Sequence, residues 1–207
     1  MAERGRPRCF DREQALTKAM DVFWRNGYEG SSLAHLTEAM GINSPSLYAT
    51  FGSKEALFKE AVDQYDLQEG AEIQAALESS PHVRTAISNM LQTSATCFSD
   101  PDKPAGCMVL LAATNCTPEN ASVWQYMSER RKHSLDILQQ RLARAVAEGD
   151  IPACADVEKM AAFYGSVRNG MSIQARDGAS RALLQAIAEA AMGAWDGLIA
   201  TPANADA

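Results

Sequence analysis

The chain has 207 residues, 46% of them hydrophobic, and a formal net charge of −7. It can therefore bury a substantial core, as one large domain or as a small module joined to a larger one. Its longest apolar run, CMVLLAA at residues 107–113, is too short to span a membrane, and the N-terminus lacks the apolar core of a signal peptide, so we expect a cytoplasmic protein. The five cysteines are irregularly spaced without a C-x-x-C pair, which argues against a disulfide framework or a zinc site.

A basic segment, RGRPR at residues 4–8, precedes an otherwise acidic chain. Residues 1–60 are balanced in charge, and the whole acidic excess lies downstream. Composition alone leaves two interpretations open, a solubilising disordered tail or an arm for a polyanion.

The apolar pattern is helical throughout, and we expect an all-α fold. No sustained run alternates with a period of two, and the later prolines fall between periodic segments, as helix boundaries should. The first segment ends near Gly27, and its apolar residues share one helical face: Leu16, Ala19, Met20 and Phe23.

Two short predicted helices follow, with a tight turn between them. SSLAHLTEAM offers Ser32 or its neighbour as N-cap, GIN breaks the helix, and SPSLYATF begins the next with Ser44 as cap and Pro45 at its first position. This is the arrangement of a helix-turn-helix, whose second helix must be slim at its N-terminal end to enter the major groove. Leu47 and Phe51 would anchor that helix, which leaves five positions facing DNA: Asn43, Ser44, Ser46, Tyr48 and Thr50.

Residues 10–62, FDREQALTKAMDVFWRNGYEGSSLAHLTEAMGINSPSLYATFGSKEALFKEAV, resemble the DNA-binding domain of the tetracycline-repressor (TetR/AcrR) family of bacterial transcription regulators. The most specific piece is GINSPSLYATFGSKEALF, in which a Leu-Tyr pair, a Phe three residues after that Tyr and a Ser-Lys-Glu follow at the family's spacing. The resemblance covers about the first third of the chain. Thr50 departs from it, because many relatives carry His or an aromatic residue there, and this puts a phosphate contact by Thr50 in doubt.

The resemblance and the chemistry together indicate individual DNA contacts. Tyr48 lies about 100° around the helix from Leu47, away from the buried face, and the matching tyrosine of the family meets the DNA backbone. Lys54 falls in the first turn of the next helix, where phosphate is favoured. The alternatives are a core tyrosine and a solvated surface lysine. We add Ser32 to the predicted DNA contacts.

The resemblance also gives the basic arm a partner. An arginine arm ahead of a helix-turn-helix can reach into the minor groove, and GRP at residues 5–7 is the core of an AT-hook. We therefore expect Arg4, Arg6 and Arg8 to contact operator DNA.

The predicted organisation has five parts: a flexible basic arm at 1–9, the helix-turn-helix domain at 10–52, a connector helix at 53–80 weakened at Gly70, an effector-binding and dimerisation domain at 81–200, and a disordered tail at 201–207. Within the fourth part, residues 119–149 predict one long helix. Family members use the connector to transmit ligand binding to the recognition helices.

Two apolar stripes near the C-terminus are the expected dimer interface, since the family pairs two such helices from each subunit in a four-helix bundle. The alternative is that both cover the core of their own subunit. The stripes are Val157, Met160, Ala161, Tyr164, Val167 and Met171, and then Leu184, Ile187, Ala191, Ala194, Trp195 and Leu198.

We predict an organic effector pocket, because apolar walls with few polar groups are typical of such sites. Asn115 is its most telling member, since a buried amide without a partner costs about 1–3 kcal/mol. The competing interpretation for each residue is ordinary core packing. The predicted pocket residues are Phe98, Cys107, Met108, Leu111, Asn115, Cys116, Trp124 and Met127.

Together these features predict a homodimeric repressor that a small molecule releases from double-stranded operator DNA. The alternatives are a metal- or redox-sensing repressor that uses Cys107 and Cys116, and a helical interaction protein that never binds DNA. The three histidines are scattered, and neither a nucleophile elbow nor a phosphate-binding glycine loop occurs, so no enzyme, cofactor or metal site is predicted.

Overall fold

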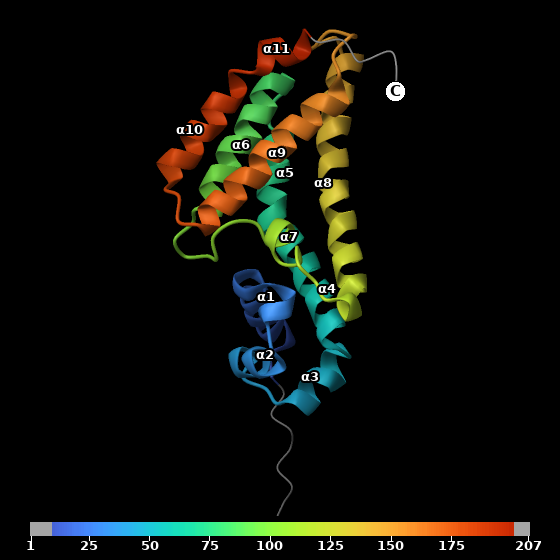
Figure 1. The fold of residues 1–207 in the computed structure, drawn as a ribbon, viewed down its shortest axis with the longest axis vertical. Coiled ribbons are helices and arrows are strands. Elements are labelled where there is room, and N and C mark those ends of the chain that lie inside the picture. Colours follow the sequence, from blue (N-terminus) through green and yellow to red (C-terminus); the bar gives the residue numbers. More distant parts are fainter. Residues whose placement is uncertain (1–9, 201–207) are drawn as a thin grey trace, which may run out of the picture.

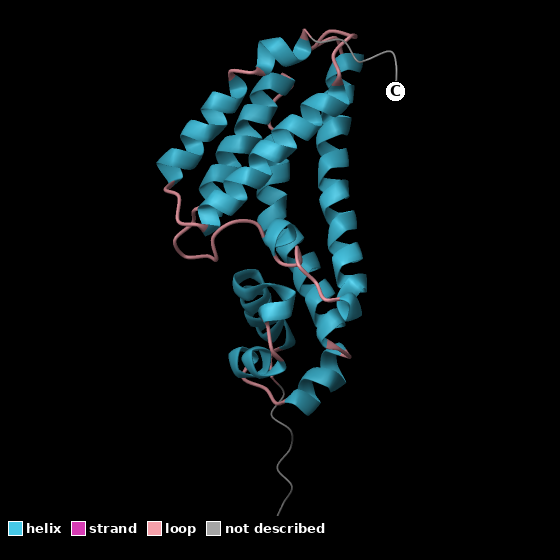
Figure 2. Ribbon diagram, in the orientation of Figure 1, coloured by secondary structure: helices cyan, strands magenta, loops and turns pink. Residues whose placement is uncertain are grey.

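A computed structural model of the chain describes residues 10–200, and within this range it contains helices and no strand, which confirms the all-α prediction (Figure 2). A small group of helices lies at one end of an elongated molecule, and a larger bundle lies at the other (Figure 1). No helix in residues 10–200 is long and apolar enough to cross a membrane. The predicted arm at 1–9 and tail at 201–207 lie outside the described residues.

The small end is built from α1 (Arg12–Gly30), α2 (Leu33–Met40) and α3 (Ser44–Phe51). Ser32 caps α2 by accepting a hydrogen bond from the backbone N–H of His35. Asn43, not Ser44, caps α3, because the Asn43 side chain accepts from the N–H of Ser46 at 2.9 Å. The cap predicted at Ser44 was therefore wrong by one residue: asparagine is as good an N-cap as serine and stands one position earlier.

Gly27 breaks α1 where the sequence predicted the helix to end. Its φ of 71° is in the left-handed region, and a Cβ there would lie 3.0 Å from the Ala112 carbonyl oxygen. The next residue, Tyr28, donates its N–H to that oxygen at 2.7 Å. Glycine is thus required both by conformation and by close contact with the second half of the chain.

The connector is helical from end to end but not uniform. α4 (Lys54–Tyr65) continues through a π-helical turn, η1 (Asp66–Gly70), into α5 (Ala71–Glu78). The predicted weak point at Gly70 is the last residue of this turn. Because π-helical turns recur at functional sites, the residues packed around η1 are candidates for a functional site.

The larger bundle consists of α6, α8, α9 and α10 with short elements between and after them (Figure 1). The long helix predicted at 119–149 is α8. The bounds are α6 (Val83–Phe98), α7 (Met108–Leu111), η2 (Pro118–Asn120), α8 (Ala121–Ala147), α9 (Val157–Arg176), α10 (Arg181–Met192) and α11 (Trp195–Ile199).

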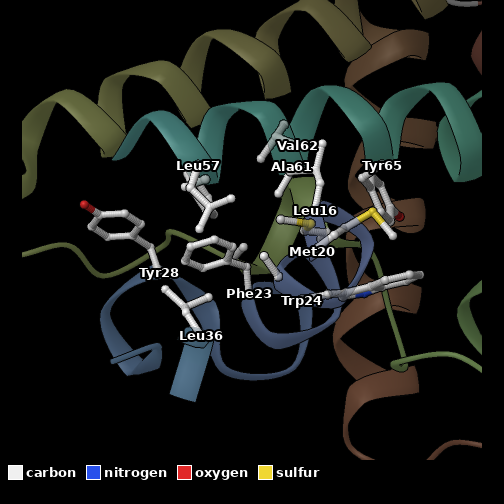
Figure 3. Packing of buried hydrophobic residues seen from close by; sticks show 14 of the residues in the cluster. Leu16, Met20, Phe23, Trp24, Tyr28, Leu36, Leu57, Ala61, Val62 and Tyr65 are labelled. Carbon is white, nitrogen blue, oxygen red and sulfur yellow. The ribbon is translucent and has the colours of Figure 1, made fainter. Parts of the chain in front are cut away.

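Two hydrophobic clusters hold these parts together. The DNA-side cluster joins α1–α3 to α4, and in it Phe23 of α1 packs edge-on against Phe58 of α4 with ring centres 5.0 Å apart. Figure 3 shows Trp24 and Tyr28 of α1 facing the same connector helix. This cluster extends past residue 52 to Met108 and Met127, so the second half of the chain contributes to the core of the first. The bundle cluster fills the space between α5, α6, α8, α9 and α10.

The two C-terminal stripes mainly cover the core of their own subunit. Trp195 is only 3% exposed and lies against Tyr164, with ring centres 6.0 Å apart. The exposed apolar residues of α9 and α10 are instead Ile173 and Leu183, at 52% and 50%. An interface on these helices would therefore use faces turned away from most of the predicted stripe residues.

Candidate DNA-binding surface and effector cavity

The polar side of α3 is available to a partner, because its apolar side packs into the interior of the DNA-binding end. Leu47 and Phe51 are buried in the DNA-side cluster, as predicted from their spacing. Among the predicted DNA contacts, Ser32, Asn43, Ser44 and Tyr48 are exposed, and Ser46 and Thr50 are half-buried. Capping engages Ser32 and the Asn43 amide oxygen, so the Asn43 NH₂ group is the part left for a base.

Tyr48 and Lys54 carry the side chains best suited to a phosphate backbone. Tyr48 is 46% exposed, whereas Leu47 and Phe51 of the same helix are buried. Lys54 begins α4, and its Nζ lies 4.2 Å from the centre of the Tyr28 ring. Burial lowers the pKa of Lys54, and nearby Glu29 partly offsets this effect. A cation held over an aromatic face is positioned before DNA arrives, so Lys54 is not the freely solvated lysine of the alternative.

The predicted arm contacts, Arg4, Arg6 and Arg8, lie outside the described residues. The described chain begins beside α3: Phe10 packs against the DNA-side cluster, and the Arg12 guanidinium lies 4.7 Å from the centre of the Phe51 ring. A second contact fixes Arg12, its ion pair with Glu60 at 2.6 Å. The described chain therefore begins next to the helix expected to read DNA.

A cavity of about 440 Å³, here called the connector cavity, lies between the connector and the bundle. Its apolar walls come from η1, α5, α6, α7 and α8. Its polar lining is concentrated near η1 and α8. The apolar residues are Leu67, Ile73, Leu77, Met90, Phe98, Val109, Leu110, Ile137 and Leu138, and the ionisable ones are Asp63, Tyr65, Asp66, Cys107, Arg130, His133 and Arg168.

Only two of the eight predicted pocket residues, Phe98 and Cys107, line this cavity. The others are distributed elsewhere because α7 packs toward α1, where Ala112 meets Tyr28. Asn115 is exposed, so its amide has water and the reason for placing it in a pocket is removed. Met108 and Met127 belong to the DNA-side cluster, Trp124 is 48% exposed, and Leu111 and Cys116 are half-buried outside the cavity lining.

An ion-pair group at the cavity joins the connector to α8, and we call it the connector clamp. Arg130 of α8 binds the carboxylates of Asp63 in α4 and Asp66 in η1, the latter at 3.1 Å. The Tyr126 hydroxyl donates to Asp63 at 3.1 Å. Burial raises the pKa of Asp66, although Arg130 opposes the shift. The clamp thus connects the wall of the cavity to the helix that starts at Lys54.

Sequence reasoning missed the charged side of the cavity, although its spacing is visible afterwards. Asp63, Asp66 and Leu67 recur at the interval of one helical face, and so do Arg130, His133 and Ser134. In a single sequence, charged residues at this spacing cannot be distinguished from those of a solvent-exposed helix face. Only the packing of α8 beside the connector shows that the two faces meet.

The two cysteines of the metal-sensing alternative have different surroundings. Cys107 lines the connector cavity beside the buried Tyr65 hydroxyl and packs against both clusters, whereas Cys116 packs against the DNA-side cluster alone. Burial raises the pKa of Cys116, which disfavours the thiolate that binds metals. Within residues 10–200, no three His, Cys, Asp or Glu side chains gather in a group that could hold a metal ion.

Known proteins share both the sequence and the fold. Residues 15–61 match the family described as "Bacterial regulatory proteins, tetR family". The HTH-type transcriptional repressor ComR of Escherichia coli K12 is 39% identical over 95% of this chain and 94% of its own. The HTH-type transcriptional repressor BdcR of the same organism is 33% identical over 91% of this chain and 89% of its own.

A solved structure extends the likeness to DNA binding. It is a cysteine mutant of CifR, a TetR family transcriptional regulator, in complex with 26-base-pair double-stranded operator DNA. CifR is 46% identical, covers 92% of this chain and 100% of its own, and superposes with a TM-score of 0.89. The likeness spans both the helix-turn-helix end and the bundle.

Proposed function

Because the chain belongs to the tetR family of bacterial regulatory proteins, and is therefore a DNA-binding transcriptional repressor, we propose how its parts divide the work. α3 binds the operator, exposed faces of α9 and α10 pair two subunits, and an organic effector in the connector cavity releases the DNA. One observation carries the proposal: the helix that begins at Lys54 beside α3 ends against the cavity, at the connector clamp.

The docking of α3 follows from its exposed residues. Its N-terminal end presents Ser44, Ser46 and the Asn43 amide NH₂, groups small enough to approach base edges in the major groove. Tyr48 and Lys54 stand to the side, where they reach phosphates and set the position of the helix. The bases are thus read by short polar groups, and the affinity comes mainly from the backbone contacts.

The homodimer fixes the distance between two copies of α3, one from each subunit. α9 and α10 expose Ile173 and Leu183 among small residues, which permits close helix packing in a four-helix interface. Two heads related by twofold symmetry require half-sites about one helical turn apart, roughly 34 to 36 Å, with some bending or overlap. The operator is therefore a palindrome.

Effector release follows from population shift. A ligand that binds better to a conformation with altered head spacing lowers operator affinity by its differential affinity for the two states. The connector clamp is the element on which a ligand in the cavity acts, because Arg130 both lines the cavity and binds α4.

The test is selection of bound duplexes from a random DNA pool by the purified protein, followed by anisotropy measurements on the selected operator. We expect a shared palindrome, weaker binding by Tyr48→Ala, and altered sequence preference in Ser46→Ala. Arg84→Gln, on the exposed surface of α6, is the control and should bind as the wild type does. A pool without a shared sequence, or an unaffected Tyr48→Ala, would refute the docking.

A further inference from the structure

We infer that the ligand of the connector cavity is an organic anion, an acid such as a carboxylate with an apolar body, whose charged group is held by Arg168 and Arg130. This inference rests on the proposed function, in which the cavity binds the effector, and it adds the chemical class of that effector.

Both acids of the cavity pair with Arg130, which leaves Arg168 as the lining guanidinium without a carboxylate partner in residues 10–200. Arg168 of α9 is half-buried in the lining, and among the described residues it has no hydrogen bond, ion pair or aromatic partner. Arg130 uses one terminal nitrogen for both acids of the clamp, and its Nε is buried without an acceptor in residues 10–200. His133 also lines the cavity, and its ring offers a further hydrogen-bonding group.

The buried Nε–H of Arg130 is costly to leave unpaired, so a ligand that accepts a hydrogen bond there is favoured. A carboxylate matches the planar fork of arginine and can take two parallel hydrogen bonds from it. The site has the donors and the charge for this, and Arg168 is free to supply them.

A cationic ligand is disfavoured because both cavity acids are already engaged. Asp63 and Asp66 share Arg130, and Asp63 also accepts from Tyr126. A ligand cation would have to compete with Arg130 for these carboxylates, and it would meet the guanidinium of Arg168, which has no carboxylate partner in residues 10–200.

The apolar walls and the volume of the cavity determine which apolar part the acid can carry. Its walls include Phe98, Met90, Ile73 and Leu138, which favour a hydrocarbon chain or an aromatic ring. The volume of about 440 Å³ lies within the range of small-molecule pockets, so a compact single acid fits rather than a polymer.

A second hollow of about 370 Å³ between α8 and α9 also touches Arg168, and it supplies the discriminating control. Lys132 lines this second hollow and is absent from the lining of the connector cavity. The affinity for an acid in the connector cavity should therefore fall when Arg168 is replaced by a neutral residue, but not when Lys132 is replaced. Each replacement removes one positive charge, so the two variants are matched in charge.

The experiment is calorimetric titration of the full-length protein with carboxylates from butanoate to dodecanoate and with benzoate and phenylacetate, each beside the alcohol and the amine of the same skeleton. We expect at least one acid to bind roughly tenfold or more tightly than its alcohol and amine. Arg168→Gln should remove that preference and leave alcohol binding unchanged, whereas Lys132→Gln should retain it.

Three results would overturn the inference: no binding by any acid, equal binding of an acid and its alcohol, or equal losses in Arg168→Gln and Lys132→Gln. The last would place the anion in the second hollow. Parallel anisotropy with the selected operator separates the two proposals. Release of DNA by an alcohol but not by its acid would support the proposed function and refute the inference that the ligand is an anion. An acid that binds through Arg168 without releasing DNA would support the anion site and refute release through this cavity.

Discussion

Replacing Arg176 by methionine should weaken the attachment of the DNA-binding end to the bundle. Arg176, in the last turn of α9, donates to the carbonyl oxygens of Trp24 at 2.8 Å, Arg25 at 3.2 Å and Ala105 at 3.0 Å. The Trp24 carbonyl depends on this contact because α1 breaks at Gly27, and the N–H of Tyr28 that would normally bond it goes to Ala112 instead. Arg176 therefore acts as a distant C-cap of α1.

The magnitude follows from the number and kind of these hydrogen bonds. A hydrogen bond from a charged donor contributes about 1.5–3 kcal/mol, but three from one side chain are not additive and this one is only half-buried. We expect Arg176→Met to lower the free energy of unfolding by about 2–4 kcal/mol, since methionine keeps most of the apolar stem and none of the donors.

Urea denaturation followed by circular dichroism and tryptophan fluorescence, at one fixed concentration of the dimer, measures this loss. The matched control is Arg84→Met, because Arg84 makes an exposed ion pair with Asp196 at 3.3 Å that should contribute under about 1 kcal/mol. If Arg176→Met were no less stable than Arg84→Met, the capping role of Arg176 would be refuted.

Lys54→Ala should weaken operator and non-specific DNA about equally and reduce the salt slope by about one counterion per half-site, and an unchanged slope in anisotropy titrations would contradict a phosphate contact. Leu183→Glu should give folded monomers in sedimentation, because it places a charge on an exposed apolar position of α10, and persistence of the dimer would move the interface elsewhere. Trp195→Ala should instead destabilise each subunit by about 3–5 kcal/mol, since this side chain is buried within one chain, and a wild-type midpoint in urea would be inconsistent with that burial. Hydrogen bonds from His82, and then from the backbone of Val83, lower the pKa of Asp150, so its contribution is complete above the ordinary aspartate pKa and is lost as the pH falls through the lowered value. Asp150→Asn should therefore flatten the fall in stability below about pH 4, and unfolding curves that stay parallel to the wild type would disprove this linkage.

The DNA-binding end could be predicted because its determinants are local. The buried face of α3 needs only the four-residue spacing of Leu47 and Phe51, and the helix starts need only a capping side chain within three residues. Even the error at Ser44 is a choice between two adjacent good caps. The family resemblance then added partners and roles that spacing alone does not carry.

The cavity could not be predicted because it depends on contacts between distant segments. The apolar run at residues 107–113 has the composition of a pocket wall, yet Met108 packs into the DNA-side cluster and Cys107 faces the cavity. The Tyr28–Ala112 hydrogen bond, between segments far apart in the sequence, holds the end of this run against α1. Likewise, Asp66 and Arg130 form an ion pair only because α8 packs beside η1, which the sequence does not show.

In the mechanism that we propose, the position of the clamp along the connector determines how far an effector must move the helix. The clamp residues Asp63 and Asp66 follow Lys54 along the connector, so the clamp lies roughly 14 to 18 Å from Lys54 along the helix axis at 1.5 Å per residue. At that distance, tilting a rigid helix by about 10° moves its far end by roughly 2 to 3 Å. In a dimer the two heads would move together, and the separation between them would change by up to twice this amount against a fixed half-site spacing. A ligand therefore needs only a small displacement at Arg130, and the π-helical turn that ends at Gly70 lies where the connector can accommodate it.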